Sequence, residues 1–238
     1  MSTHRDVRRA LANYANPTKA KSSAWFFKTG KGHYGEGDKF LGVTVPEQRI
    51  VARQFRDLSL PDIQTFLDSP YHEHRLTAVI ILVLQYQVAD DKQKEKITRF
   101  YLANAKRVNN WDMVDSSAPH ILGDFLLKRP RTVLYRLSKS KNLWERRISI
   151  IATQAFIRHG EFDDTLKIAK ALLADPHDLI HKAVGWMLRE VGDRDKKMER
   201  SFLTRHAYHM PRTMLRYAIE KFPKQERGMF LARKQPRL

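Results

Sequence analysis

The sequence has 238 residues, and its 44 lysines and arginines against 26 aspartates and glutamates give a net charge of +18, which is typical of nucleic-acid binders but also of ribosome-associated or merely well-solvated basic proteins. It contains no cysteine, which excludes disulfides, cysteine-ligated metal sites and thiol nucleophiles. Hydrophobic residues make up 42% of the chain, enough for a packed core, so we expect a single globular domain over residues 1–238.

Helix-forming residues recur three and four positions apart along the chain, and no stretch alternates with period two, so we predict an all-α fold. Seven of the ten prolines support this assignment, because each of them precedes an apolar periodic segment, as a residue at the first helical position does. We therefore expect helices to begin near Pro17, Pro46, Pro61, Pro70, Pro130, Pro176 and Pro211.

Residues 29–43, TGKGHYGEGDKFLGV, contain five glycines and lack the GKS or GKT of a phosphate-binding P-loop. We interpret them as a flexible surface loop. The triplet at residues 72–74, His-Glu-His, is too closely spaced for a zinc pair on a helix and is expected on the surface. The candidates for phosphate contact in and beside the loop are Lys28, Lys31, His33 and Lys39.

The longest apolar run, TAVIILVL at residues 77–84, is far shorter than the roughly 18 residues that indicate a membrane span. The N-terminal residues lack the apolar region of a signal peptide. We therefore expect a soluble protein of a bacterial-type cytoplasm, associated with the nucleoid and with no membrane.

Internal repetition predicts the architecture. Five segments can be aligned with one another, and their equivalent positions are 37, 35, 35 and 30 residues apart. A period of this size, with a shorter helix such as residues 163–175 ahead of one copy, is typical of HEAT-like helical-pair solenoids. We predict an α-α superhelix whose concave, basic face is built from the second helix of each pair. The equivalent positions are Arg75, Asp112, Arg147, Lys182 and Arg212.

Basic residues recur in the same register of these helices, so stacking would line them up as a cationic stripe. Helix starts also direct free backbone N–H groups outward, which suits phosphates. For any one of these residues a solvated surface role is the ordinary alternative, and their recurrence favours double-stranded DNA. The candidate DNA-binding residues are Arg146, Arg147, Lys182, Arg189, Arg212 and Arg216, and further backbone contacts are expected from Lys221, Arg227, Arg233 and Lys234.

Residues 108–126, VNNWDMVDSSAPHILGDFL, put acids at the front of an apolar run in this basic chain. Asp115 lies four residues after Trp111, so both project from one face of a helix, while Asp112 sits in the first turn as a candidate cap. Two interpretations of Asp115 remain open. It is either catalytic, or it forms an ion pair with Arg147 that tethers neighbouring repeats.

A carboxylate near DNA repels phosphates, so a catalytic one calls for a cationic target. A purine alkylated at N3 or N7 is such a target, because the base is positive and cleavage of its glycosidic bond builds positive charge on the sugar. Asp115 would stabilise that charge and align a water for attack at C1′. The indoles of Trp111 and Trp186 would favour the cationic base by roughly 0.5 to 2 kcal/mol each. Trp186, four residues after Lys182, is otherwise plain core.

Three motifs carry a family resemblance: NNWDMVDSSAPHILG, LWERRISIIATQAF and HKAVGWMLREVG. On these the chain resembles the AlkD-type DNA glycosylases, HEAT-like repeat proteins that excise cationic alkylpurines, most strongly over residues 70–220. The resemblance implies that Asp115 is the catalytic aspartate of a Trp-Asp-x-x-Asp motif and that Trp111 and Trp186 accompany it. It also implies that Arg147 contacts the backbone of the lesion strand, with Arg189 following the second tryptophan.

The resemblance further implies a monofunctional hydrolysis that leaves an abasic site, without metal or cofactor and without extrusion of the base into a pocket. We expect the protein to act as a monomer. Two alternatives remain open. One is a catalytically silent HEAT-like protein that recognises distorted or branched DNA, and the other is an interaction solenoid whose positive face meets an acidic protein partner.

Overall fold

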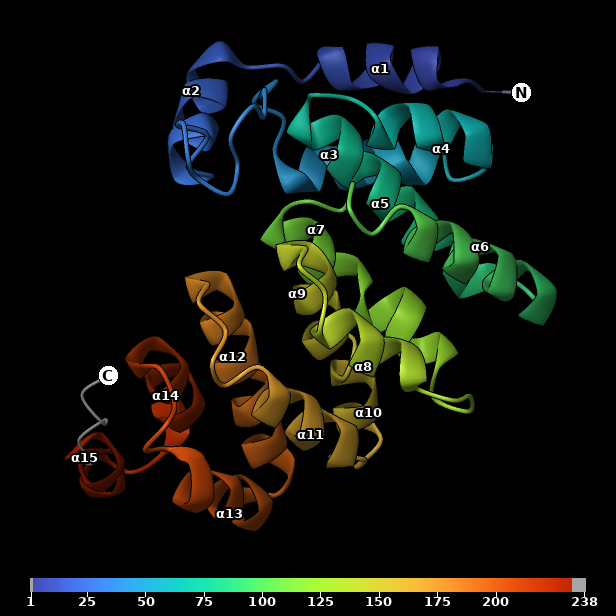
Figure 1. Ribbon diagram of the computed structural model, residues 1–238. Coiled ribbons are helices and arrows are strands. Elements are labelled where there is room, and N and C mark those ends of the chain that lie inside the picture. The colour runs from blue at the N-terminus through green and yellow to red at the C-terminus, as the bar shows by residue number, and fades with distance from the viewer. Residues whose placement is uncertain (1, 233–238) are drawn as a thin grey trace. The chain divides into compact units, whose positions relative to one another are not determined.

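The computed structural model describes residues 2–232, and these form helices joined by loops (Figure 1). The described residues include no β-strand, only one isolated bridge between Lys39 and Tyr71. The all-α prediction is confirmed. The chain divides into two compact units, Met1–Ile121 and Leu122–Leu238, which are described in turn. The prediction of one domain over the whole chain stays a prediction.

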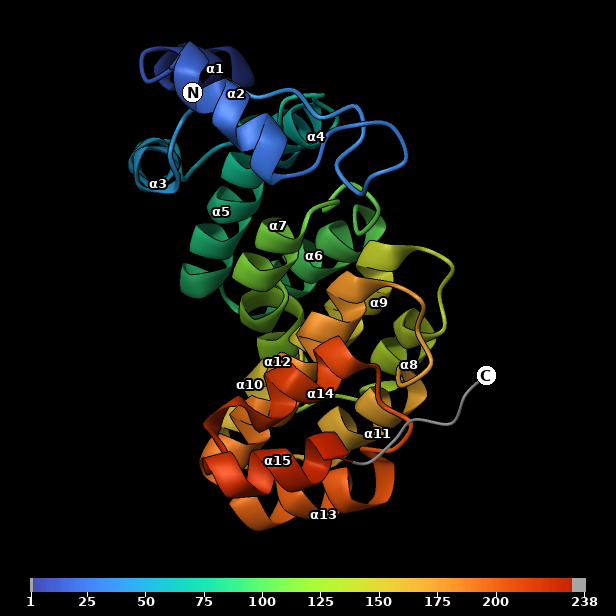
Figure 2. The ribbon, with the colours of Figure 1, turned by 90° about the vertical axis from the view of Figure 1, so that its left-hand side faces the viewer.

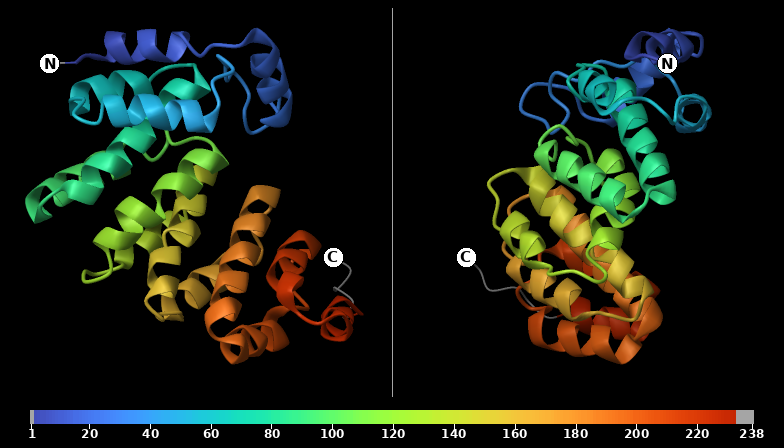
Figure 3. Two further views of the ribbon diagram at one scale, coloured as in Figure 1. Left: turned by 180° about the vertical axis from the view of Figure 1, so that it is seen from behind. Right: turned by 90° about the vertical axis from the view of Figure 1, so that its right-hand side faces the viewer.

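The first unit is organised around α5, which spans His72–Val88. Its middle is apolar on every side, as expected of a helix that neighbours enclose, and Val79, Ile81 and Leu82 are fully buried. α5 packs against α3, α4, α6 and α7, and α1 lies over α3 and α4 (Figure 3). The other helices of this unit are α1 (His4–Ala12), α2 (Pro17–Phe26), α3 (Val45–Gln54), α4 (Leu60–Leu67), α6 (Asp91–Ala103) and α7 (Trp111–Ser117).

The second unit is organised around α12, which spans Asp178–Arg194 and packs against α9, α13 and α14 (Figure 2). Gly185 permits the close approach of α14, because a Cβ there would lie 2.4 Å from the Met214 carbonyl oxygen. The remaining helices of this unit are α8 (Thr132–Ser138), α9 (Leu143–Ile151), α10 (Gln154–Arg158), α11 (Asp163–Ala171), α13 (Lys196–His206), α14 (Arg212–Ala218), the 3₁₀ turn Ile219–Lys221 and α15 (Lys224–Ala232).

The prolines mark helix starts as expected. Pro17 is the first residue of α2, and Pro46 and Pro61 are the second residues of α3 and α4. Pro211 is the N-cap of α14. Pro70, Pro130 and Pro176 each lie two residues before a helix, α5, α8 and α12 respectively.

The five aligned segments all contain helices, but three are not continuous α-helices, and the fifth passes from α14 into the 3₁₀ turn Ile219–Lys221. After α7 the chain forms a π-helix over Pro119–Gly123, where proline cannot donate the backbone hydrogen bond of a regular α-helix. The segment 146–158 breaks between α9 and α10. At that break a Cβ on Gly123 would lie 2.3 Å from the Ala152 carbonyl oxygen, so the backbones meet too closely for a side chain.

The loop at residues 29–43 is anchored to the start of α5. Backbone N–H groups of Leu41, Gly42 and Val43 all donate to the Glu73 carboxylate, the shortest at 2.8 Å. The expectation that residues 72–74 lie on the surface is wrong, because all three are only 1 to 3% exposed. The loop contacts His72 and Glu73, while His74 packs against the rings of Phe66 and Tyr71.

Among residues 2–232, no helix combines the length and the apolar character needed to cross a membrane.

Candidate active site

The start of α7 is fixed by two polar side chains. Asn110 is fully buried, and its Oδ1 accepts a hydrogen bond from the Trp111 backbone N–H at 2.8 Å. Asp112 Oδ1 accepts from the Met113 backbone N–H, also at 2.8 Å. Both satisfy amides that the first turn of a helix leaves without partners, so Asp112 does act at the helix start.

Asp112 has a second partner, His72. The Asp112 Oδ2 lies 2.8 Å from His72 Nε2, and Asp38 Oδ2 lies 3.6 Å from Nδ1 on the other side of the same ring. Burial by itself lowers the pKa of His72, but the hydrogen bond to Asp112 and the nearby carboxylate of Asp38 outweigh it and raise the pKa to about 9. The imidazole is therefore a buried cation between two carboxylates at neutral pH.

Arg75 belongs to the same network. Its guanidinium pairs with Asp38 at 2.6 Å and donates to the Ser69 carbonyl at 2.8 Å, and the residue is only 4% exposed. Arg75 is therefore buried and paired, whereas the sequence predicted that it would line an outward-facing cationic stripe. Asp38 comes from the glycine-rich loop, 37 residues away in sequence, so the neutralising partner could not be read locally.

An aromatic cluster connects this network to Trp111. The His72 ring packs against Phe27 and Phe40, with centroids 4.5 and 4.9 Å away, and Phe27 stacks on the Trp111 indole at 5.6 Å. Phe26 meets Trp111 edge-on at 6.1 Å. Trp111 itself is half-buried. The indole is thus held by rings of the α2 end while part of it stays accessible.

Asp115 is half-buried on α7, one turn after Trp111. The charge of Asp115 acts on Tyr101, a fully buried residue of α6. Burial raises the pKa of Tyr101, the hydrogen bond to Ser117 at 2.9 Å opposes that rise, and the negative charge of Asp115 adds to it. Asp115 therefore lies close enough to Tyr101 for its charge to act on the phenol. Both interpretations of this carboxylate, catalytic and structural, remain predictions.

In the second unit, Trp186 is half-buried on α12, and its indole N–H donates to Glu190 Oε1 at 2.8 Å. The two residues are four apart on one helix, so this spacing was visible in the sequence although Glu190 was not singled out. Arg147 is buried, and its guanidinium donates to the Leu179 carbonyl at the start of the same helix. The indole is thus oriented by a carboxylate, whereas Arg147 joins α9 to α12.

Four of the other predicted cations pair with acidic side chains, and only the partner of Lys182 is close in sequence. Arg146 pairs with Asp175 at 2.6 Å and Lys182 with Asp178 at 2.7 Å. Arg189 pairs with Glu220, and Lys221 with Asp193. Arg212, Arg216 and Arg227 are exposed, and Arg212 donates to the Leu231 carbonyl. Arg233 and Lys234 lie outside the described residues. The positive charge of this unit is therefore less concentrated than its sequence indicates.

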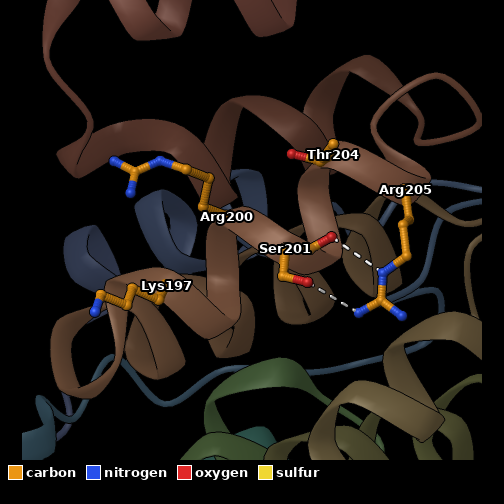
Figure 4. A pocket seen from close by; sticks show the side chains of 5 residues that line it. All are labelled: Lys197, Arg200, Ser201, Thr204 and Arg205. Atoms are coloured by element: carbon orange, nitrogen blue, oxygen red, sulfur yellow. Dashed lines mark hydrogen bonds between the residues drawn. The ribbon is translucent and has the colours of Figure 1, made fainter.

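A shallow depression lies elsewhere in the second unit, along α13 (Figure 4). Arg205 turns back to donate to Ser201, and Arg200 forms a two-pronged ion pair with Glu226. All of its lining residues belong to one helix surface: Lys197, Arg200, Ser201, Thr204 and Arg205. In the part of the chain that the structure describes, no group of three or more histidine, aspartate or glutamate side chains could hold a metal ion.

Residues 7–222, which include α7 and α12, match the model of the DNA alkylation repair enzyme family. The chain belongs to this family. A solved structure described as a predicted DNA alkylation repair enzyme from Enterococcus faecalis aligns with a TM-score of 0.71 and 16% identity, covering 88% of this chain and 97% of that one. At this identity the likeness establishes the α-α superhelical fold shared with that family member. No curated protein matches the sequence.

A role in alkylation damage repair, with DNA as the substrate, follows from membership of the DNA alkylation repair family. The match covers both tryptophan motifs. The roles of Trp111, Asp115, Trp186 and the arginines remain predictions.

Proposed function

We propose that this member of the family is an AlkD-type glycosylase, which hydrolyses the N-glycosidic bond of cationic N3- or N7-alkylated purines in duplex DNA. The observation that carries the proposal is the position of Asp115 on α7. Asp115 lies four residues after Trp111, so the two side chains share one face of the helix, and both residues are half-buried. The resemblance assigns the chemistry to Asp115, while Asp112 pairs with His72 and accepts from the Met113 amide.

In the proposed reaction, water forms a bond to C1′ while the bond from C1′ to the purine nitrogen breaks. The bonding electron pair returns to the positively charged base, which leaves as a neutral molecule. Positive charge accumulates on the sugar ring between these events, and the Asp115 carboxylate stabilises it and orients the water. The proton released from the water passes to the carboxylate or to solvent, and an abasic site remains.

The indoles of Trp111 and Trp186 would contact the lesion nucleotide, where their faces attract positive charge. Glu190 supports this role for Trp186, because it fixes the indole N–H at 2.8 Å. Exposed Arg212 and Arg216 would contact phosphates, as would Arg146, Lys182 and Arg189 once DNA competes for them with their acidic partners. Buried Arg147 is assigned to a contact with the lesion-strand backbone, and one chain suffices for the reaction.

The test is release of free base from duplex DNA that contains 7-methylguanine or 3-methyladenine, in buffer with a metal chelator. The wild-type protein should release base above the spontaneous rate. Asp115→Asn should slow release roughly 100-fold or more, while affinity for duplex with an abasic-site analogue stays near the wild-type value. Asp57→Asn is the matched control, since this carboxylate is 95% exposed and removes the same charge.

Three results would speak against the proposal. No release by the wild-type protein would remove the glycosylase and favour a silent DNA-binding protein, provided that duplex affinity falls steeply with salt. Unchanged release by Asp115→Asn would remove the assigned carboxylate. Loss of the folded state in Asp115→Asn, seen by circular dichroism, would favour the structural interpretation of Asp115.

A further inference from the structure

The end of α2 presents the most exposed large hydrophobic side chain of residues 2–232. Trp25 is 84% exposed, and neighbouring Phe26 is 56% exposed. Phe26 also contacts Trp111 edge-on, so this aromatic surface adjoins the candidate active site within the first unit. Two adjacent aromatic side chains this open to water are typical of a surface that binds a partner.

The charge around Trp25 favours a polyanionic partner. Residues 17–35 contain lysines but no aspartate or glutamate. Lys21 lies four residues before Trp25 on α2, so these two side chains share one face of the helix, and Lys28 follows two residues after the last residue of α2. Both lysines are exposed, and among the described residues neither has an acidic partner.

Lys28 also occupies an unusual backbone position. Its φ is +54°, and it is the only non-glycine residue of the described chain with a positive φ. Glycine or asparagine would adopt this conformation at lower cost. A lysine side chain at such a position is explained by a use for its charge.

We propose that Trp25, flanked by Lys21 and Lys28, is a stacking platform for an unpaired nucleobase of DNA. Indoles stack on bases of every sequence, and lysines on either side suit the phosphates that flank the base. The base must be unpaired because, in an intact duplex, neighbouring base pairs cover both of its faces. This inference rests on the proposed DNA substrate and extends it, since it gives this family member a preference for DNA whose stacking is interrupted.

The experiment compares the affinity of the full chain for three oligonucleotides of one sequence: a paired duplex, the same duplex with one bulged nucleotide, and the single strand. Trp25→Ala should weaken binding to the bulged duplex and the single strand roughly tenfold or more. Binding to the paired duplex should change less than about twofold, the noise of such a comparison. Val88→Ala, at a residue 80% exposed on another helix, is the matched control and should change none of the three.

Lys28→Gly provides the second variant. It removes the charge and relieves the positive φ, so the protein should melt no lower than wild type while its affinity for the bulged duplex falls. Equal affinity of Trp25→Ala and wild type for bulged DNA would overturn the inference, as would an equal loss on all three DNAs. If wild type binds none of them at low salt, the proposed function falls together with it, whereas loss of the Trp25 effect alone leaves base release intact.

Discussion

Replacing His72 by glutamine should remove a large pH-dependent contribution to stability. A rise of the imidazole pKa from the ordinary 6.5 to about 9 corresponds to about 3 kcal/mol of extra stability when the ring is fully protonated. Because the folded pKa is raised, this contribution is complete below pH 6.5 and is lost as the pH rises through 9. Glutamine can donate to one carboxylate but carries no charge.

The assay is urea unfolding of wild type and His72→Gln at intervals from pH 6 to 10. Trp144→Phe and Trp186→Phe in both backgrounds leave only Trp25 and Trp111, so the emission reports the first unit. The stability gap should be widest at pH 6 and should narrow by about 3 kcal/mol by pH 10. Other titrating groups are common to both proteins and cancel in the difference. A gap that stays constant across this range would refute a charged His72.

Two further substitutions test the second unit. The Glu199 side chain is 1% exposed and packs against Gly192. Burial raises the pKa of Glu199 to about 8, although Lys196 lies 3.4 Å away and lowers it. Because the folded state disfavours the charged carboxylate, stability falls as the pH rises from 4.5 through 8. Glu199→Gln should therefore match wild type at pH 4 and exceed it by up to about 4 kcal/mol at pH 9 in urea unfolding; a constant difference would contradict this. Gly185→Ala should lower stability by about 1 to 3 kcal/mol and depress the melting temperature, because a methyl group there meets the α14 backbone. Gly228→Ala, whose added methyl meets nothing within 4 Å, should not.

Local rules predicted the helices well and the environment of their polar residues poorly. Prolines and caps act within a few residues, so helix starts could be read from the sequence, as at Pro17. The burial of His72 and Arg75 depends on Asp38, more than 30 residues away, and no local pattern signals it. The π-helix after α7 was not predicted, because the apolar periodicity of the sequence continues through Pro119.

The candidate site divides in the same way. The spacing of Trp111 and Asp115 follows from helix geometry alone, and so does the contact of Trp186 with Glu190. The ion pair between Arg146 and Asp175 joins residues 29 positions apart, so it does not follow from helix geometry. A sequence therefore reveals which charges a chain contains more readily than which of them remain available to a ligand.

The Glu73 carboxylate accepts hydrogen bonds from the backbone of Leu41, Gly42 and Val43. These bonds restrict how the chain could be redesigned for tighter binding to polyanions. Supercharging replaces acids with neutral side chains, and solvated ones such as Asp57 allow it. Glutamine is a poor substitute for Glu73, because its NH₂ would replace Oε2, which accepts from the Leu41 N–H at 3.0 Å, and its oxygen would receive the other amides without a negative charge. Even in so cationic a protein, some negative charges are part of the scaffold.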